Sequence, residues 1–286
     1  MRRLRRLRRR TNGGPGYAIA ELEQAPTPTP DPTAAGFFDL DNTMLQGASV
    51  YYLARGLAAR KFFTARDLVR FGLKQMRFRI LAAEHGGHVS QAREQALAFV
   101  AGRPVEELRV LAEEIFDELM AERIWSGTHA LARMHLEAGQ RVWLVTAAPV
   151  EVGLVIARRL GLTGAIGTVA EVQDGVYTGR LVGGLMHGPA KAAAITDLAT
   201  LEGLDLSRCA AYSDSINDVP MLSAVGRAVA VNPDSALRRV AREKGWEIRD
   251  FRTGRRAVRM AVPAALGAGM AAGAIAAAFA VNRRKR

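Results

Sequence analysis

Residues 36–43 read Gly-Phe-Phe-Asp-Leu-Asp-Asn-Thr, and this segment gives the clearest indication of the fold. Its apolar start predicts a short buried strand that ends at Asp39. Side chains two residues apart share a face of a strand, so Asp39 and Asp41 should emerge together where the strand ends. Ligands of open parallel α/β sheets bind at that carboxyl edge. Two carboxylates there favour a bound cation or a shared proton, although an Asp-x-Asp pair in a surface loop is the alternative.

Two further candidate residues follow later in the chain. Thr146 ends a predicted strand at 141–146, where its hydroxyl would either bind a phosphate oxygen or only shape a turn. Lys191 follows Gly-Pro-Ala at a predicted helix start, where a cation and free backbone donors would neutralise phosphate charge. Since a solvated helix lysine is the alternative, neither residue decides the function by itself.

A second acidic motif, Tyr-Ser-Asp-Ser-Ile-Asn-Asp at 212–218, follows a predicted strand at 209–213. Asp214, Asn217 and Asp218 supply hard oxygen ligands of the kind that magnesium prefers, in a site open to water and a substrate phosphate. Asp218 as the N-cap of the next helix is the alternative, and both roles are compatible.

The remaining sequence alternates between strand and helix signals, which predicts an α/β fold with a parallel sheet covered by helices. The predicted elements are a helix near 128–138, strands at 141–146, 209–213 and 228–231, a helix at 150–160, and a hairpin around Asp174-Gly175. From 48 to 124 the pattern is helical and carries no strand signal. Residues 11–35 are rich in Gly, Pro and Thr, which predicts a linker.

The four motifs, in this order and each at a strand end or helix start, resemble the haloacid dehalogenase superfamily over roughly residues 36–250. The helical insertion is similar to the small cap of its phosphoserine-phosphatase-like branch. The resemblance implies a Rossmann-like, doubly wound core at 36–47 and 126–250 with an all-helical cap at 48–125. A basic arm and linker at 1–35 precede this unit, and a tail at 251–286 follows it.

The resemblance also implies a magnesium-dependent phosphomonoester hydrolase acting on a small phosphorylated substrate. Asp39 would form an aspartyl-phosphate, while Asp41 protonates the leaving oxygen and later activates water. The implied phosphate-binding residues are Thr43, Thr146, Lys191 and Asn217, and the implied magnesium site comprises Asp39, Asp41 through its backbone carbonyl, Asp214 and Asp218.

Two features leave the substrate and the exact reaction open. Phosphoserine phosphatases carry a glutamate about nine residues after the nucleophile, whereas Ala48 and Ser49 occupy that region here, so phosphoserine is not the expected substrate. A phosphotransferase with the same intermediate and a non-catalytic, membrane-tethered binding protein are the alternative functions.

The net charge of +12 is concentrated in the two tails. Residues 1–10 and 252–286 hold 15 of the 40 basic residues and no acid, so the middle carries 25 bases and all 28 acids. This mildly acidic middle argues against a nucleic-acid-binding core, and the tails are the segments that would meet anionic lipid headgroups or RNA. The single cysteine, Cys209, excludes an internal disulfide and is expected in a buried strand.

The segment Met260–Val281 contains 22 residues and no charge, which suits a membrane-spanning C-terminal hydrophobic helix. Eleven of these residues are Ala, so a helix docked on the domain is the alternative. Gly269 and Gly273 would allow close helix packing in a homodimer. Residues 11–16 contain no apolar stretch like that of a signal peptide, so we expect a cytoplasmic catalytic domain anchored to the inner face of the cell membrane.

Overall fold

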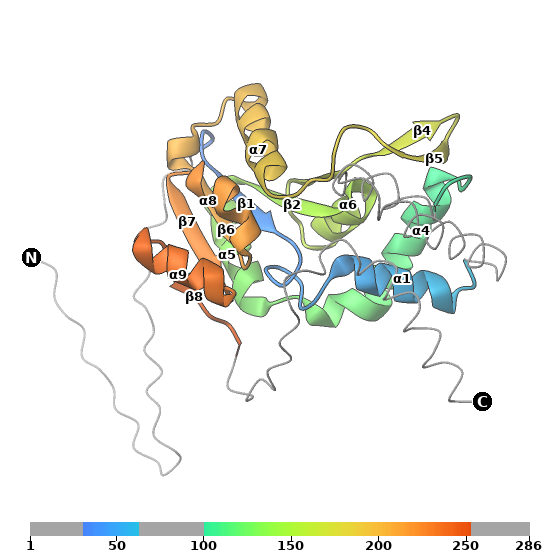
Figure 1. Cartoon of the computed structure of the whole chain (residues 1–286), viewed down its shortest axis with the longest axis horizontal. Helices are drawn as coiled ribbons and strands as arrows, with labels where there is room; N and C mark the ends of the chain where they lie inside the picture. Colours follow the sequence, from blue (N-terminus) through green and yellow to red (C-terminus); the bar gives the residue numbers. More distant parts are fainter. Residues whose placement is uncertain (1–30, 63–99, 253–286) are drawn as a thin grey trace, which may run out of the picture.

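The structure is a computed structural model that describes residues 31–62 and 100–252. Its centre is a six-stranded parallel sheet with the strand order β3-β2-β1-β6-β7-β8 (Figure 1). The strands are β1 (Ala35–Asp39), β2 (Arg141–Pro149), β3 (Gly164–Thr168), β6 (Ala210–Ser213), β7 (Arg227–Val231) and β8 (Glu247–Arg249). The predicted α/β fold with a parallel sheet is therefore confirmed.

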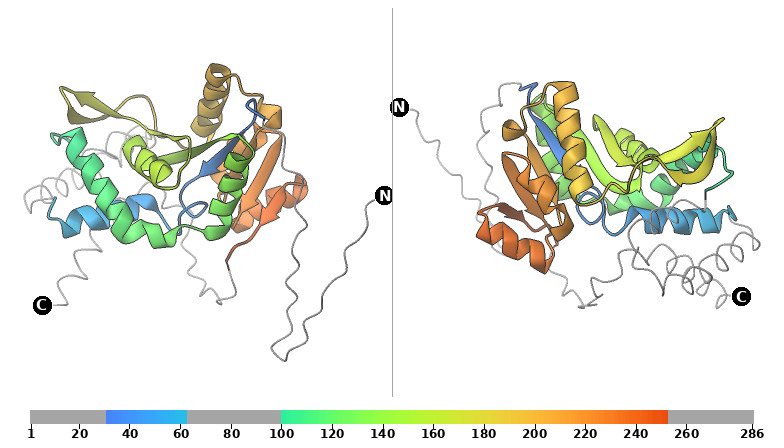
Figure 2. Two further views of the ribbon diagram at one scale, coloured as in Figure 1. Left: turned by 180° about the vertical axis from the view of Figure 1, so that it is seen from behind. Right: turned by 45° about the horizontal axis from the view of Figure 1, so that its top comes forward.

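Helices lie on both sides of this sheet (Figures 1 and 2). One hydrophobic cluster joins the sheet to α5 (Ser126–Glu137) and α6 (Val150–Arg159), and a second joins it to α7 (Pro189–Glu202), α8 (Val219–Ser223) and α9 (Ser235–Glu243). Alternation within β1 explains the two layers, because Phe38 contributes to the first cluster and Phe37 to the second. Both residues are buried because a parallel sheet is covered on both faces.

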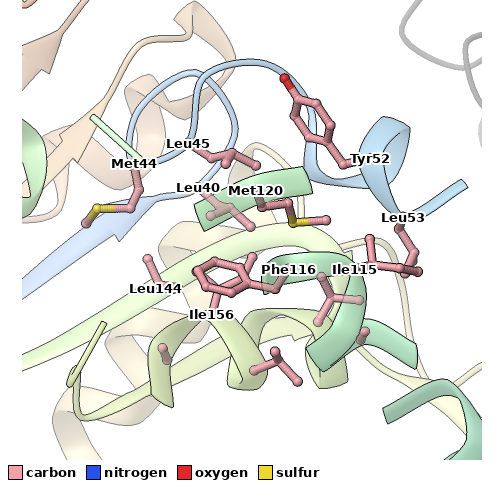
Figure 3. Close-up of a cluster of buried hydrophobic side chains, with 14 of the residues drawn as sticks. Leu40, Met44, Leu45, Tyr52, Leu53, Ile115, Phe116, Met120, Leu144 and Ile156 are labelled. Atoms are coloured by element: carbon pink, nitrogen blue, oxygen red, sulfur yellow. The ribbon is translucent and has the colours of Figure 1, made fainter. Parts of the chain in front are cut away.

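The described part of the insertion after β1 is helical. It comprises α1 (Ser49–Ala59), α4 (Val105–Ile115), the π-helix η1 (Phe116–Met120) and the 3₁₀-helix η2 (Ala121–Arg123). Figure 3 shows how their apolar side chains meet those of the sheet: Leu53 and Ile115 come from the insertion, and Leu144 and Ile156 come from β2 and α6. The insertion thus shares one continuous hydrophobic core with the sheet and the helices on one of its sides.

The predicted hairpin around Asp174-Gly175 is confirmed. β4 (Ala170–Gln173) pairs with β5 (Val176–Leu181), and the two turn residues both have positive φ, 50° and 76°. Asp and Gly tolerate this conformation, which matches the twist of a two-residue hairpin. The hairpin also pairs with the insertion, because Tyr177 accepts a hydrogen bond from Gly102 N–H at 2.8 Å and donates one to the Arg103 carbonyl at 2.9 Å.

The chain leaves β1 toward β2 and β3 on one side and later returns to β6, β7 and β8 on the other. The carboxyl ends of β1 and β6 therefore flank the point where the strand order reverses, the usual ligand site of such sheets. Phe38 and Tyr212, next to the last residues of these strands, stack with ring centroids 4.1 Å apart. The Tyr212 hydroxyl also bonds to the His135 ring of α5 at 2.7 Å, so the two strand ends are firmly held.

Some element boundaries differ from the prediction, and some predicted segments lie outside the described residues. β2 continues three residues past Thr146 to Pro149, and β3 and β8 were not predicted. Cys209 is buried, as expected, but it lies one residue before β6 rather than in the strand. The basic arm and the segment Met260–Val281 lie outside the described residues. Among the helices in 31–62 and 100–252, none is long and apolar enough to cross a membrane.

Candidate active site

Three of the predicted site residues meet at the carboxyl edge of the sheet. The Lys191 ammonium on α7 donates to Asp39 Oδ1 at the end of β1 and to Asp218 Oδ2 at 2.7 Å, in the 3₁₀-helix η4 (Ile216–Asp218). All three residues are buried: Asp39 is 6% exposed, Lys191 3% and Asp218 2%. Ion pairs this deeply buried are rare unless each charge is compensated by a partner.

The start of α7 explains how Lys191 reaches this position. Gly188 has a φ of 56°, a conformation that favours glycine, and Pro189 follows at the first helical position. A Cβ on Gly188 would lie 3.5 Å from the backbone oxygen of Asn217. The loop and the helix start therefore pack directly against the acidic motif, which brings Lys191 beside Asp218.

Negative charge exceeds positive charge in this cluster. Burial raises the pKa of Asp39 to about 7, and the neighbouring Asp218 and Asp41 add to the shift while Lys191 opposes it. Burial by itself lowers the pKa of Lys191, but the carboxylates of Asp39 and Asp218 outweigh that effect and raise the pKa above its usual value. The lysine consequently stays charged, and the site retains an affinity for further positive charge.

Asp214 is held against this cluster by Thr43. The Thr43 hydroxyl donates to Asp214 Oδ1 at 3.3 Å and accepts the Asp214 N–H at 2.9 Å, so the first and last motifs are bonded reciprocally. Burial raises the pKa of Asp214, and the charge of Asp39 raises it further. The two carboxylates are therefore close enough to disfavour each other's ionised form.

Asp41 lies beside the start of α1. Its Oδ1 accepts a hydrogen bond from the Ser49 N–H at 2.8 Å. Burial raises the pKa of the Asp41 carboxyl, and the hydrogen bonds of Ser49 partly oppose that shift. Asp41 thus belongs to the same electrostatic cluster as Asp39 without bonding to Lys191.

The two other predicted phosphate contacts make only local hydrogen bonds in the described structure. Thr146 is buried, and its hydroxyl accepts the Ala148 N–H at 3.1 Å. The Asn217 side chain is exposed, and its amide donates to the Ser215 hydroxyl at 3.2 Å. Neither side chain is hydrogen-bonded to the carboxylates.

Comparison with known proteins identifies the family. The family model of haloacid dehalogenase-like hydrolases matches residues 37–223. The chain belongs to the haloacid dehalogenase-like hydrolase family. A relative from Mycobacterium tuberculosis, named phosphoserine phosphatase SerB1, is 59% identical over 233 residues, which cover 82% of this chain and 76% of the relative. The resemblance stated from the motifs is therefore confirmed.

Solved structures share the fold of this chain. A protein of unknown function from Bordetella pertussis shares 33% identity with a TM-score of 0.65, over 77% of this chain and 99% of that one. An apo-form structure of phosphoserine phosphatase has a TM-score of 0.51 over 77% of this chain and 94% of that one, at 18% identity, so it supports the haloacid dehalogenase fold alone.

Two residues of this haloacid dehalogenase site were missed by sequence reasoning. The Ser213 hydroxyl donates to Asp218 Oδ2 at 2.8 Å and accepts the Ser215 N–H, so it fixes the carboxylate that Lys191 contacts. Asp234 caps α9 and accepts the Ile216 N–H at 3.2 Å, and its charge raises the pKa of Asp214. The sequence shows Ser213 as a polar residue at the end of a strand and Asp234 as an N-cap residue. It does not show which groups their side chains bond to.

The donor set fits a magnesium ion. In the described ranges no three His, Cys, Asp or Glu side chains are assembled as a metal site. Magnesium, however, is usually held by one or two carboxylates, waters and substrate phosphate rather than by a protein cage. Within the described structure, the hydrogen bonds of the Asp39 and Asp214 carboxylates involve Oδ1 only, which leaves each Oδ2 available. The excess negative charge around them favours the same ion.

Proposed function

We propose that this chain is a magnesium-dependent phosphomonoester hydrolase that works through an aspartyl-phosphate on Asp39. The observation that carries the proposal is the buried Asp39 carboxylate at the sheet edge, paired with an ammonium that also bonds to Asp218. Lys191 favours the ionised, nucleophilic form of Asp39 and supplies positive charge for a phosphoryl group. The phosphatase name of the mycobacterial relative supports the same class of reaction.

The proposed reaction has two displacements. In the first, an Asp39 oxygen attacks phosphorus, the bond to the leaving oxygen breaks, and Asp41 gives that oxygen a proton. In the second, Asp41 takes a proton from water, the water oxygen attacks phosphorus, and the bond to Asp39 breaks, which releases phosphate. Lys191 and Thr146 would hold the phosphoryl oxygens.

Thr43 and Asn217 stay predicted phosphate contacts. In the described structure the Thr43 hydroxyl bonds to Asp214, so its support of that carboxylate is the nearer role. The candidate holders of magnesium are Asp39, Asp214 and Asp218 with the Asp41 backbone carbonyl. When bound there, magnesium would neutralise phosphate charge and orient the substrate.

Removal of metal tests this assignment. We expect chelation of divalent ions to abolish phosphate release from p-nitrophenyl phosphate and added magnesium to restore it. Asp214→Asn should raise the magnesium concentration needed for half-activation by about tenfold or more, because a neutral amide is a poorer ligand for a hard dication. Asp205→Asn is the matched control, since the exposed Asp205 side chain accepts from Ser207 and the Asp205 N–H donates to the Thr33 carbonyl just before β1, at the opposite edge of the sheet. Equal magnesium titrations for both variants would contradict the Asp214 assignment.

The substrate is proposed only as a small phosphorylated molecule. The mycobacterial relative is named for phosphoserine, yet Ala48 and Ser49 stand where a substrate-binding glutamate is expected. Phosphate release from lyso-phospholipid, sugar, amino-acid and nucleotide monophosphates, compared under one set of conditions, identifies the class.

We also propose that the two tails attach the enzyme to the inner face of the membrane, with Met260–Val281 as the anchor. Each basic residue near an anionic surface contributes roughly 1 kcal/mol, so the arm alone would bind in a salt-sensitive way. We expect the full chain to stay in the membrane fraction after a high-salt wash and a chain ending at Phe251 to be released. Release of both forms would contradict a spanning anchor.

A further inference from the structure

The loop between Asp41 and α1 closes on itself. Asn42 has a φ of 59°, its N–H donates to the Gly47 carbonyl at 3.2 Å, and its Oδ1 accepts the Gly47 N–H at 3.1 Å. Asparagine tolerates this left-handed conformation better than most residues. The closed loop carries the chain back, so that Ser49 lies beside Asp41 although eight residues separate them.

The Asp41 side chain takes the place of an N-cap side chain at the start of α1. The N-cap residue Ala48 has no side-chain acceptor, and the Ser49 N–H at the first helical position donates to Asp41 Oδ1 at 2.8 Å. Unsatisfied N–H groups at a helix start attract such an acceptor. The backbone bond engages Oδ1 of the Asp41 carboxyl, and the buried Ser49 side chain lies beside the same carboxyl and also lowers its pKa.

α1 is itself held in place by the rest of the insertion. A Cβ on Gly56 would lie 2.3 Å from Ile115 Cγ1, so α1 and α4 approach closely. The Tyr52 hydroxyl on α1 donates to the Gln46 carbonyl at 2.7 Å, and the Gln46 N–H donates to the Arg123 carbonyl at 2.8 Å. The direction of the Asp41 carboxylate therefore depends on where α1 sits.

We infer that the N-terminus of α1 positions Asp41 for proton transfer, with the Ser49 N–H as the positioning group. The inference rests on the proposed function. Because Oδ1 accepts the N–H, it is the carbonyl-type oxygen of a protonated Asp41, and the proton is carried on Oδ2. Oδ2 then gives that proton to the leaving oxygen and later accepts one from water, so the carboxyl returns to its starting state.

Ser49→Pro removes this N–H and also the buried Ser49 hydroxyl. Ser49→Ala removes the hydroxyl and keeps the N–H, so the two variants separate the contributions, and the larger loss is expected from Ser49→Pro. Proline is favoured at the first helical position, and the preceding Ala48 is already extended, with φ −96° and ψ 125°. The matched control is Ser126→Pro, at the first position of α5, where Trp125 is also extended and Ser126 is exposed. All three variants are compared with the wild-type full chain in the presence of magnesium.

The readout is the ratio of kcat/KM for an alkyl phosphate to kcat/KM for p-nitrophenyl phosphate. An alkoxide must be protonated as it leaves, whereas p-nitrophenolate leaves as a stabilised anion. General acid catalysis contributes roughly 10²–10⁴-fold, so Ser49→Pro should lower the ratio by about tenfold or more, and Ser126→Pro should not change it. A variant damaged only in its fold would lose both activities together.

Each other outcome contradicts the inference. An unchanged ratio means that Asp41 does not depend on the Ser49 N–H, and a raised ratio means that the bond holds Asp41 away from its working position. Should Ser49→Pro not fold, Asn42→Gly decides, because it removes one of the two hydrogen bonds that close the loop and is expected to lower the same ratio a few-fold. Absence of phosphate release by the wild-type chain would instead overturn the proposed function itself.

Discussion

Asp39→Asn is expected to abolish phosphate release while the protein stays folded. Asparagine has nearly the same shape and its amide oxygen still accepts from Lys191, but it has no anionic oxygen to attack phosphorus. Loss of the attacking group should cost many orders of magnitude in kcat, so less than about one percent of the wild-type rate should remain. Steady-state phosphate release measures the loss of turnover. Trapping of radiolabelled phosphate on the denatured protein measures the loss of the aspartyl-phosphate.

The fold of this variant is checked separately. Burial raises the pKa of Asp39, so the ionised carboxylate is costly in the folded state and a neutral amide should not destabilise it strongly. We therefore expect a melting temperature close to that of the wild-type chain. Asp205→Asn, at the opposite edge of the sheet, should keep both the activity and the label. Substantial turnover or labelling by Asp39→Asn would show that another group is the nucleophile.

Lys191→Met should have the largest effect on stability. Methionine fills a similar volume but leaves the buried Asp39 and Asp218 carboxylates without their cation. Breaking a buried ion pair from one side costs about 3–5 kcal/mol in the free energy of unfolding. Denaturant unfolding without divalent metal measures this loss. Lys244→Met, on the exposed surface, is the control; it loses only a cation–π contact with Trp246 and should change the free energy of unfolding by less than about 1 kcal/mol.

The stability that Lys191→Met loses should become smaller as the pH falls. The folded-state pKa of Asp39 is already about 7, above its unfolded value of 3.8, and removal of Lys191 raises it further. A carboxyl whose folded pKa is raised destabilises the fold at high pH and regains stability as it is protonated, so the deficit should shrink from about pH 8 to about pH 5. Lys191→Met with Asp218→Asn should recover part of the deficit. A pH-independent deficit would mean that lost packing, not charge, is responsible.

Local sequence patterns determined most of the fold of this protein. The apolar run before Asp39 and the runs that end near Thr146 and Ser213 became neighbouring strands of one parallel sheet. The Asp174-Gly175 turn formed where its two residues predicted it, because positive φ is a local preference. β3 and β8 were missed, since two of the five residues of Gly164–Thr168 are glycine, which is depleted in strands, and Glu247–Arg249 is a short, mostly polar edge strand.

The sequence by itself also identified the chemical groups of the site, because carboxylates, a lysine and hydroxyls at strand ends have recognisable local contexts. Only the tertiary structure decided their partners. Lys191 bonds to Asp39 across 152 residues, Thr43 bonds to Asp214 across 171, and the Ser49 N–H bonds to Asp41 after a closed loop. Such pairings depend on the strand order and on the way the helices cross. The pKa of each group depends in addition on how deeply it is buried. Spacing along the chain carries none of these quantities, since they arise only when distant segments are brought together and water is excluded.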